Sequence, residues 1–101
     1  MSTASTPSTD PEYILHLFIA GAAPNSLRAV RNAKEICEHY LPGHYVLNII
    51  DIYQQPSLVG EQQIVAAPLL VRLLPLPRRQ VLGDLSDRAK VLEVLGLPVP
   101  E

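Results

Sequence analysis

The stretch that decides the fold is residues 64–74, IVAAPLLVRLL, in which Pro68 separates two different patterns. Proline donates no backbone hydrogen bond and disfavours helical backbone at the residue before it, so we expect a helical segment to end at Ala67. The aliphatic run 69–74, interrupted only by Arg72, predicts a largely buried strand. The peptide bond that precedes Pro68 is also a place where a cis bond can occur.

Two strands are predicted before this junction. Residues 13–20 are apolar on both alternating faces, which is typical of a central strand covered by helices above and below. Residues 44–52 predict a second strand, and its interruption by Asn48 and Asp51 indicates a position nearer the sheet edge. A helical crossover of the length available between the two strands implies a right-handed parallel unit.

Three helices are predicted along the chain. The first begins at Pro24 and ends at Pro42, and the second begins at Pro56 and ends at the junction described above. The third has Ser86 as its N-cap and is ended by Gly96. The expected buried face of the first helix is Leu27, Val30, Ala33, Ile36, Cys37 and Tyr40, and that of the third is Ala89, Val91, Leu92, Val94 and Leu95.

Residues 69–74 and 80–82 are joined by a proline-bracketed turn, which predicts a hairpin rather than another crossover. The expected element order is therefore β-α-β-α-β-β-α, an α/β fold with a mixed four-stranded sheet. We expect one domain over residues 12–97, a disordered tail over 1–11 and a short tail over 98–101.

The composition predicts a single cytoplasmic domain. A chain of 101 residues buries roughly two-thirds of the surface that its unfolded form exposes. The net charge of −2 gives no field that attracts nucleic acid or acidic membranes, and no apolar run is long enough to span a bilayer. Cys37 is the single cysteine, which fits a reducing compartment, and the Ser/Thr/Pro-rich start has no apolar signal segment.

Five sequence blocks resemble the KaiB family of circadian-clock proteins. The first, LFIAGAAPNSLRA at residues 17–29, is similar to the family's opening, LYVAGxxPNSxRA. The predicted element order, with a proline just before the third strand, also resembles the thioredoxin-like fold. Four further blocks, residues 49–56, 64–70, 74–79 and 81–88, resemble the family's VIDxxxxP, ILATPTL, LPPPxRR and IIGDLSNR in the same order.

The resemblance implies a non-enzymatic clock component that needs no cofactor. Family members bind the hexameric ATPase KaiC, displace the sensor kinase SasA and sequester KaiA. They also adopt two folds: a resting tetramer of order β-α-β-β-α-α-β, and a thioredoxin-like monomer that binds KaiC with its C-terminal half rearranged. The rearrangement uses the prolines that match Pro68, Pro75 and Pro77.

The chain departs from the family pattern at several positions. Asn48 and Gln63 are neutral where clock members carry basic residues implicated in the KaiA and KaiC contacts. Val94 and Gly96 stand where clock members have Gly and Asp, and Val94 is the better helix former, which favours the thioredoxin-like last helix. These departures fit a divergent paralogue that serves another KaiC-like ATPase. An oligomeric stress-related adaptor outside the clock is the alternative.

Five residues are predicted to contact partners. Arg72 is a lone charge in an aliphatic strand, so it is either paired on a sheet face or presented to a partner. We expect Arg72 and Arg79 to supply charge to the ATPase interface. Tyr45 and Asn48 are expected to contact a second partner at the edge of the second strand. Gln63 is the fifth expected contact residue.

Thiol and metal chemistry are not expected. Thioredoxin-type catalysis needs a thiolate at the start of the first helix, and the corresponding turn, residues 21–26, contains no sulfur. Cys37 lies on the apolar face of that helix and is expected to be buried. His16 is expected in the core, whereas His39 and His44 flank a helix end and are expected at the surface, without forming a metal site. A thioredoxin-like thiol enzyme is the competing class, disfavoured because there is no CxxC pair.

Overall fold

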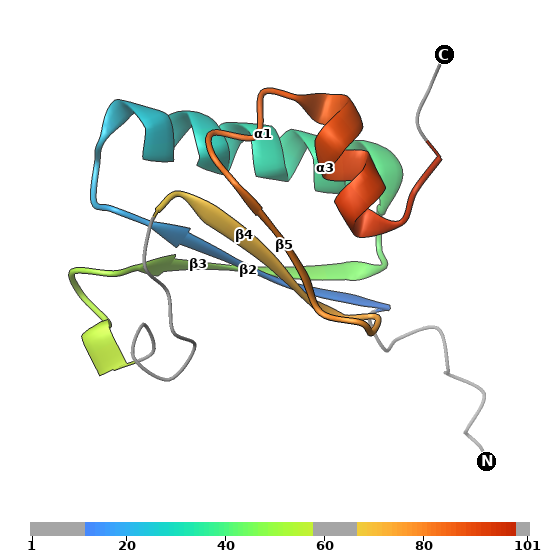
Figure 1. The fold of residues 1–101 in the computed structure, drawn as a ribbon, viewed down its shortest axis with the longest axis horizontal. Helices are drawn as coiled ribbons and strands as arrows, with labels where there is room; N and C mark the ends of the chain where they lie inside the picture. The colour runs from blue at the N-terminus through green and yellow to red at the C-terminus, as the bar shows by residue number, and fades with distance from the viewer. Residues whose placement is uncertain (1–11, 58–66, 99–101) are drawn as a thin grey trace.

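The computed structural model describes residues 12–57 and 67–98. The predicted second helix and the two predicted tails lie wholly or mostly outside these ranges. Apart from that helix, the predicted element order is confirmed. The elements are β2 (Tyr13–Ile19), α1 (Pro24–Tyr40), β3 (Tyr45–Asp51), β4 (Leu69–Leu74), β5 (Arg79–Leu82) and α3 (Arg88–Leu95), as Figure 1 shows.

The four strands form one mixed sheet in the order β3-β2-β4-β5. β2 pairs in parallel with β3, with Tyr13 opposite Tyr45, and antiparallel with β4, with Phe18 opposite Leu69. β4 and β5 form the predicted antiparallel hairpin. The predicted position of the second strand near a sheet edge is confirmed, because β3 is the outermost strand beside β2.

The helices α1 and α3 pack on the same face of the sheet (Figure 1). Leu15 and Leu17 of β2 belong to the core cluster on this face, together with buried residues of α1 and α3. Phe18 and Val71, each 0% exposed, belong to a second cluster formed by the alternate strand positions. The burial expected on both faces of the central strand is therefore present. α1 and α3 cover one of these faces (Figure 1).

The rotation of α1 differs by one position from the prediction at its start. Leu27 is 55% exposed, whereas Ser26, at 1%, and Ala29, at 0%, face the sheet. The Ser26 hydroxyl accepts a hydrogen bond of 3.0 Å from the backbone N–H of Ala20, at the end of β2. Ser26 thus lies on the same buried face as Ala29 and Ala33, and Leu27 lies beside that face. The predicted burial of Ala33, Ile36 and Cys37 is confirmed.

The N-cap of α3 is Asp87 rather than the predicted Ser86. The Asp87 carboxylate accepts a hydrogen bond of 3.2 Å from the backbone N–H of Lys90, three residues into the helix. Both residue types are good N-caps, so the pattern alone does not choose between neighbours. Ala89 is exposed, contrary to the prediction, whereas Val91, Leu92 and Leu95 are buried as predicted.

The end of α3 is formed as predicted by a left-handed glycine. Gly96 has φ +78°, a conformation that glycine adopts without the steric cost of a Cβ atom. The N–H of Leu97 returns to the carbonyl of Leu92 at 2.9 Å, which closes the helix end. The Tyr13 hydroxyl donates to the carbonyl of Leu95 at 3.0 Å and fastens this end of α3 to the first strand.

The three prolines singled out by the sequence all follow cis peptide bonds. The Ala67–Pro68 bond precedes β4, and the Leu74–Pro75 and Leu76–Pro77 bonds lie in the turn between β4 and β5. The carbonyl of Pro68 accepts a hydrogen bond of 3.0 Å from the N–H of Gly83, which ties the start of β4 to the end of β5.

Candidate partner-binding surfaces

Arg72 and Arg79 lie directly opposite each other on β4 and β5. Arg79 is exposed at the edge strand, whereas Arg72 is only 7% exposed and lies on the sheet face covered by α3. Arg72 Nη2 donates a hydrogen bond of 2.7 Å to the carbonyl of Pro77. Arg79 is therefore available to a partner in this arrangement, and Arg72 is withdrawn from the surface.

Tyr45 and Asn48 lie on β3 but point to opposite faces of the sheet, as an odd spacing along a strand requires. Tyr45 packs beside the helix-side core, and its hydroxyl donates to the Glu38 carboxylate of α1. That hydrogen bond is the main cause that raises the pKa of Tyr45 to about 12. Asn48 is exposed on the other face, opposite His16 of β2.

We expect Glu38→Ala to lower the pKa of Tyr45 toward the ordinary tyrosine value near 10. The Glu38 carboxylate accepts a hydrogen bond that the neutral phenol donates and that the phenolate cannot, so its removal no longer favours the neutral phenol. The measurement is the pH dependence of the Tyr45 ring signals by NMR. Glu35→Ala is the control because Glu35, on the same helix, pairs with Arg88 instead. A Tyr45 pKa that stays near 12 in Glu38→Ala would contradict the assigned cause.

Asn48 borders an open hollow of about 290 Å³ on the face opposite α1. His16 lies at this hollow and is partly exposed, so the prediction of a core histidine is wrong in degree. Burial, with a smaller contribution from the charge of Arg78, lowers the pKa of His16. The hollow is lined by His16, Asn48, Ile49, Ile50 and Gln55.

The structure does not bring the predicted contact residues into one site. Tyr45 and Asn48 are on the β3 edge, and Arg72 and Arg79 are on β4 and β5, with β2 between the two groups. Gln63 lies outside the described residues. The chain thus offers two separate candidate surfaces, one toward each edge of the sheet.

The loop between β2 and α1 is held by polar side chains rather than by a dithiol. The Asp51 carboxylate accepts hydrogen bonds from the N–H of Gly21 at 3.3 Å and from the N–H of Tyr53 at 2.9 Å. The ring of Tyr53 stands over Gly21 and is 73% exposed. Tyr53 is not among the predicted contact residues, although an aromatic residue just after the predicted second strand indicates a place at the sheet's end.

Cys37 is 2% exposed, as expected. Burial is the main cause that raises the pKa of its thiol to about 12, so the thiolate is scarce near neutral pH. Both His39 and His44 are exposed, as predicted. Within residues 12–57 and 67–98, no three potential ligands converge on a metal site.

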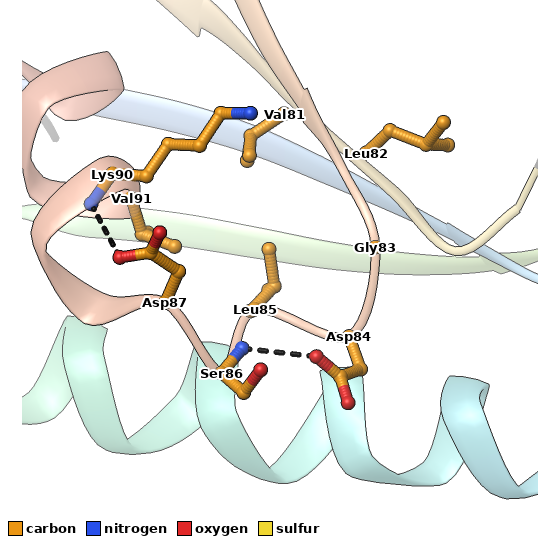
Figure 2. Close-up of a pocket in the computed structure, with 9 residues that line it drawn as sticks. All are labelled: Val81, Leu82, Gly83, Asp84, Leu85, Ser86, Asp87, Lys90 and Val91. Carbon is orange, nitrogen blue, oxygen red and sulfur yellow. Dashed lines mark hydrogen bonds between the residues drawn. The ribbon is translucent and has the colours of Figure 1, made fainter.

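A smaller hollow of about 190 Å³ lies where β5 passes into α3 (Figure 2). Asp84 organises it: its carboxylate accepts from the N–H of Ser86 at 3.1 Å and from Arg28 Nε at 3.2 Å. The Asp84 carbonyl accepts from Asn32 Nδ2 at 2.8 Å. Hydrogen bonds from Ser86, with that from Arg28, lower the pKa of Asp84. Its carboxylate is thus committed to fastening the loop onto α1.

Several large apolar side chains are exposed near these surfaces. Leu76, at 74%, projects from the turn beside Arg79, and Val46, at 38%, lies on β3 beside the Asn48 hollow. Protein interfaces combine an apolar core with a polar rim, and these two side chains place apolar surface next to candidate polar residues. The remaining exposed members are Leu27, Ile49, Tyr53, Leu74 and Leu82.

Comparisons with known proteins point to one family. The sequence profile that matches residues 16–97 is that of the KaiB domain. A curated relative from Prochlorococcus marinus subsp. pastoris, named "Circadian clock oscillator protein KaiB", is 51% identical over 85 residues. That match covers 84% of this chain and 79% of the relative.

Solved structures confirm the thioredoxin-like fold. The N-terminal domain of Synechococcus elongatus SasA superposes with a TM-score of 0.69 at 27% identity, covering 95% of this chain and 94% of that domain. Chloroplastic thioredoxin z gives a TM-score of 0.71 at 23% identity, over 88% of this chain and 79% of the other. In the described part of the chain, no helix has the length and apolar character needed to cross a membrane.

Proposed function

Because the chain belongs to the KaiB family of circadian clock proteins, we propose that it is a non-enzymatic clock regulator that binds a KaiC-type hexameric ATPase. The observation that carries this proposal is the family match over residues 16–97 on a fold shared with the SasA N-terminal domain. Burial of Cys37 and the sulfur-free turn before α1 support a binding role over thiol catalysis. A cytoplasmic location follows as part of the proposal.

The shared fold also supports competition with a SasA-type kinase. Two proteins with the same backbone can present equivalent surfaces to one ATPase, so binding of either excludes the other. Sequestration of a KaiA-type protein would use the β3 edge. An outermost strand has unpaired N–H and C=O groups that can add a strand from a partner, and Asn48 is exposed there.

The proposal includes a second, resting arrangement of order β-α-β-β-α-α-β, as a homotetramer or dimer. Pro68, Pro75 and Pro77 border the segments that would rearrange. The polar contacts that fasten this half to α1 lie near the surface: the Arg28 and Asp84 side chains of one ion pair are 47% and 26% exposed. Exposed ion pairs contribute little stability, so such contacts can be exchanged.

We expect Arg79→Glu to weaken binding to the host's KaiC-type ATPase about tenfold, a change of about 1.4 kcal/mol that is ordinary for an interface charge. Affinity is measured by biolayer interferometry, with and without a KaiA-type protein. Arg31→Glu is the matched control, since Arg31 is an exposed arginine on α1, away from the hairpin. Unchanged affinity in Arg79→Glu would remove Arg79 from the interface, and no binding by the wild-type chain would refute the proposed function.

A further inference from the structure

The guanidinium of Arg72 is buried beneath the end of α3 with its hydrogen bonding incomplete. Arg72 is 7% exposed, and Nη2 bonds to the neutral carbonyl of Pro77 at 2.7 Å. Its Nε has no hydrogen-bond partner, the one buried side-chain nitrogen or oxygen in this condition within residues 12–57 and 67–98. On the other side, a Cβ atom placed on Gly96 would lie 3.2 Å from Nη1, so the guanidinium is pressed against the end of α3.

No carboxylate balances this charge in the described part of the chain. The ion pairs found there join Arg28 to Asp84, His44 to Glu12, and Arg88 to Glu35. The residue directly opposite Arg72 across the hairpin is another arginine, Arg79. Like charges at facing positions of two strands repel each other, so Arg79 makes the burial of the Arg72 charge more unfavourable.

Burial of an ion is unfavourable unless an opposite charge and a full set of hydrogen bonds compensate it. Arg72 has one hydrogen bond to a neutral oxygen and the weak negative end of α3, which is a short helix. These contacts stabilise the buried guanidinium by less than its hydration in water does. An apolar side chain of similar length would fill the same space under Gly96 without that cost.

We infer that Arg72 is an uncompensated buried charge that weakens the packing of the C-terminal end of α3 against the sheet. The guanidinium can contact solvent or a carboxylate only when the C-terminal end of α3 moves away from the sheet, which we call the lifted state. A partner that offers a carboxylate at this point would therefore favour the lifted state. That last consequence rests on the proposed function, whereas the effect on the isolated chain does not.

The test is the thermal stability and amide exchange of the full chain carrying Arg72→Met. We expect the melting temperature to rise by roughly 5 °C, the shift that a single corrected buried charge produces in a domain of this size. Exchange of the Gly96 and Leu97 amides, which bond to the last carbonyls of α3, should slow about tenfold. Arg31→Met is the matched control on the exposed face of α1 and should leave both quantities unchanged.

A second variant, Arg79→Glu, places a carboxylate opposite Arg72 and should also raise the melting temperature and slow the same amides. If Arg72→Met lowers the melting temperature or fails to fold, Arg72 is a stabilising anchor and the inference is overturned. If Arg72→Met stabilises but Arg79→Glu does not, charge is not the cause and the inference is equally overturned. Neither measurement involves an ATPase, so failure here is distinguishable from failure of the proposed function.

Discussion

Leu92→Ala is expected to lower the free energy of unfolding by about 2–5 kcal/mol. Leu92 of α3 is 0% exposed and packs in the core between this helix and the sheet. Truncation there leaves a cavity that the surrounding side chains fill only in part. A domain of this size has a total stability of about 5–15 kcal/mol, so the loss is a large share of it. Urea unfolding followed by circular dichroism measures the change.

Leu82→Ala is the matched control for this experiment. Leu82 is 60% exposed at the end of β5, so the same truncation removes little buried surface there and should change stability by less than about 0.5 kcal/mol. A loss below about 1 kcal/mol in Leu92→Ala would show that α3 is not packed as described.

Ser26→Ala is expected to cost about 1–3 kcal/mol, although it removes a single oxygen atom. Ser26 is 1% exposed, and its hydroxyl accepts the N–H of Ala20, which would lose this partner. The change should also speed amide exchange at Ala20 and loosen the start of α1. Urea titration and NMR exchange measure the two effects.

Ser57→Ala serves as the comparison for Ser26, because Ser57 is an exposed serine for which a neutral result is expected. If Ala20 exchanges at the wild-type rate in Ser26→Ala, the hydrogen bond to Ser26 does not hold the start of α1. The same buried face includes Ala29, Ala33 and Ile36, so we expect the rest of α1 to keep its packing in this variant.

The element order could be predicted from the sequence because each boundary has its own local signal. Pro24 starts α1, Gly96 ends α3, and Pro68 separates β4 from what precedes it. The polar residues Asn48 and Asp51 were sufficient to place β3 at an edge. Such signals act over a few residues and need no knowledge of distant contacts.

The buried face of α1 and the burial of Arg72 were harder to predict. Spacing by three and four fits both the face that includes Leu27 and the face that includes Ser26 and Ala29. The hydrogen bond between Ser26 and Ala20 of β2 is a long-range contact that spacing does not reveal. Arg72 is a similar case. A charge within an aliphatic strand can lie on either face, and its burial depends on α3, which arrives from later in the chain.

The position of β2 between β3 and β4 divides the molecule along one line of hydrogen bonds. On one side, β2, α1 and β3 are consecutive in the chain and complete their parallel pairing by themselves. On the other, β4, β5 and α3 join through the antiparallel β2–β4 ladder and a few contacts to α1. Units of this kind open separately in native proteins, so the fold has the layout of two foldons sharing one strand. We expect the N-terminal unit to keep its register when the C-terminal unit opens, which amide exchange resolved by residue would measure.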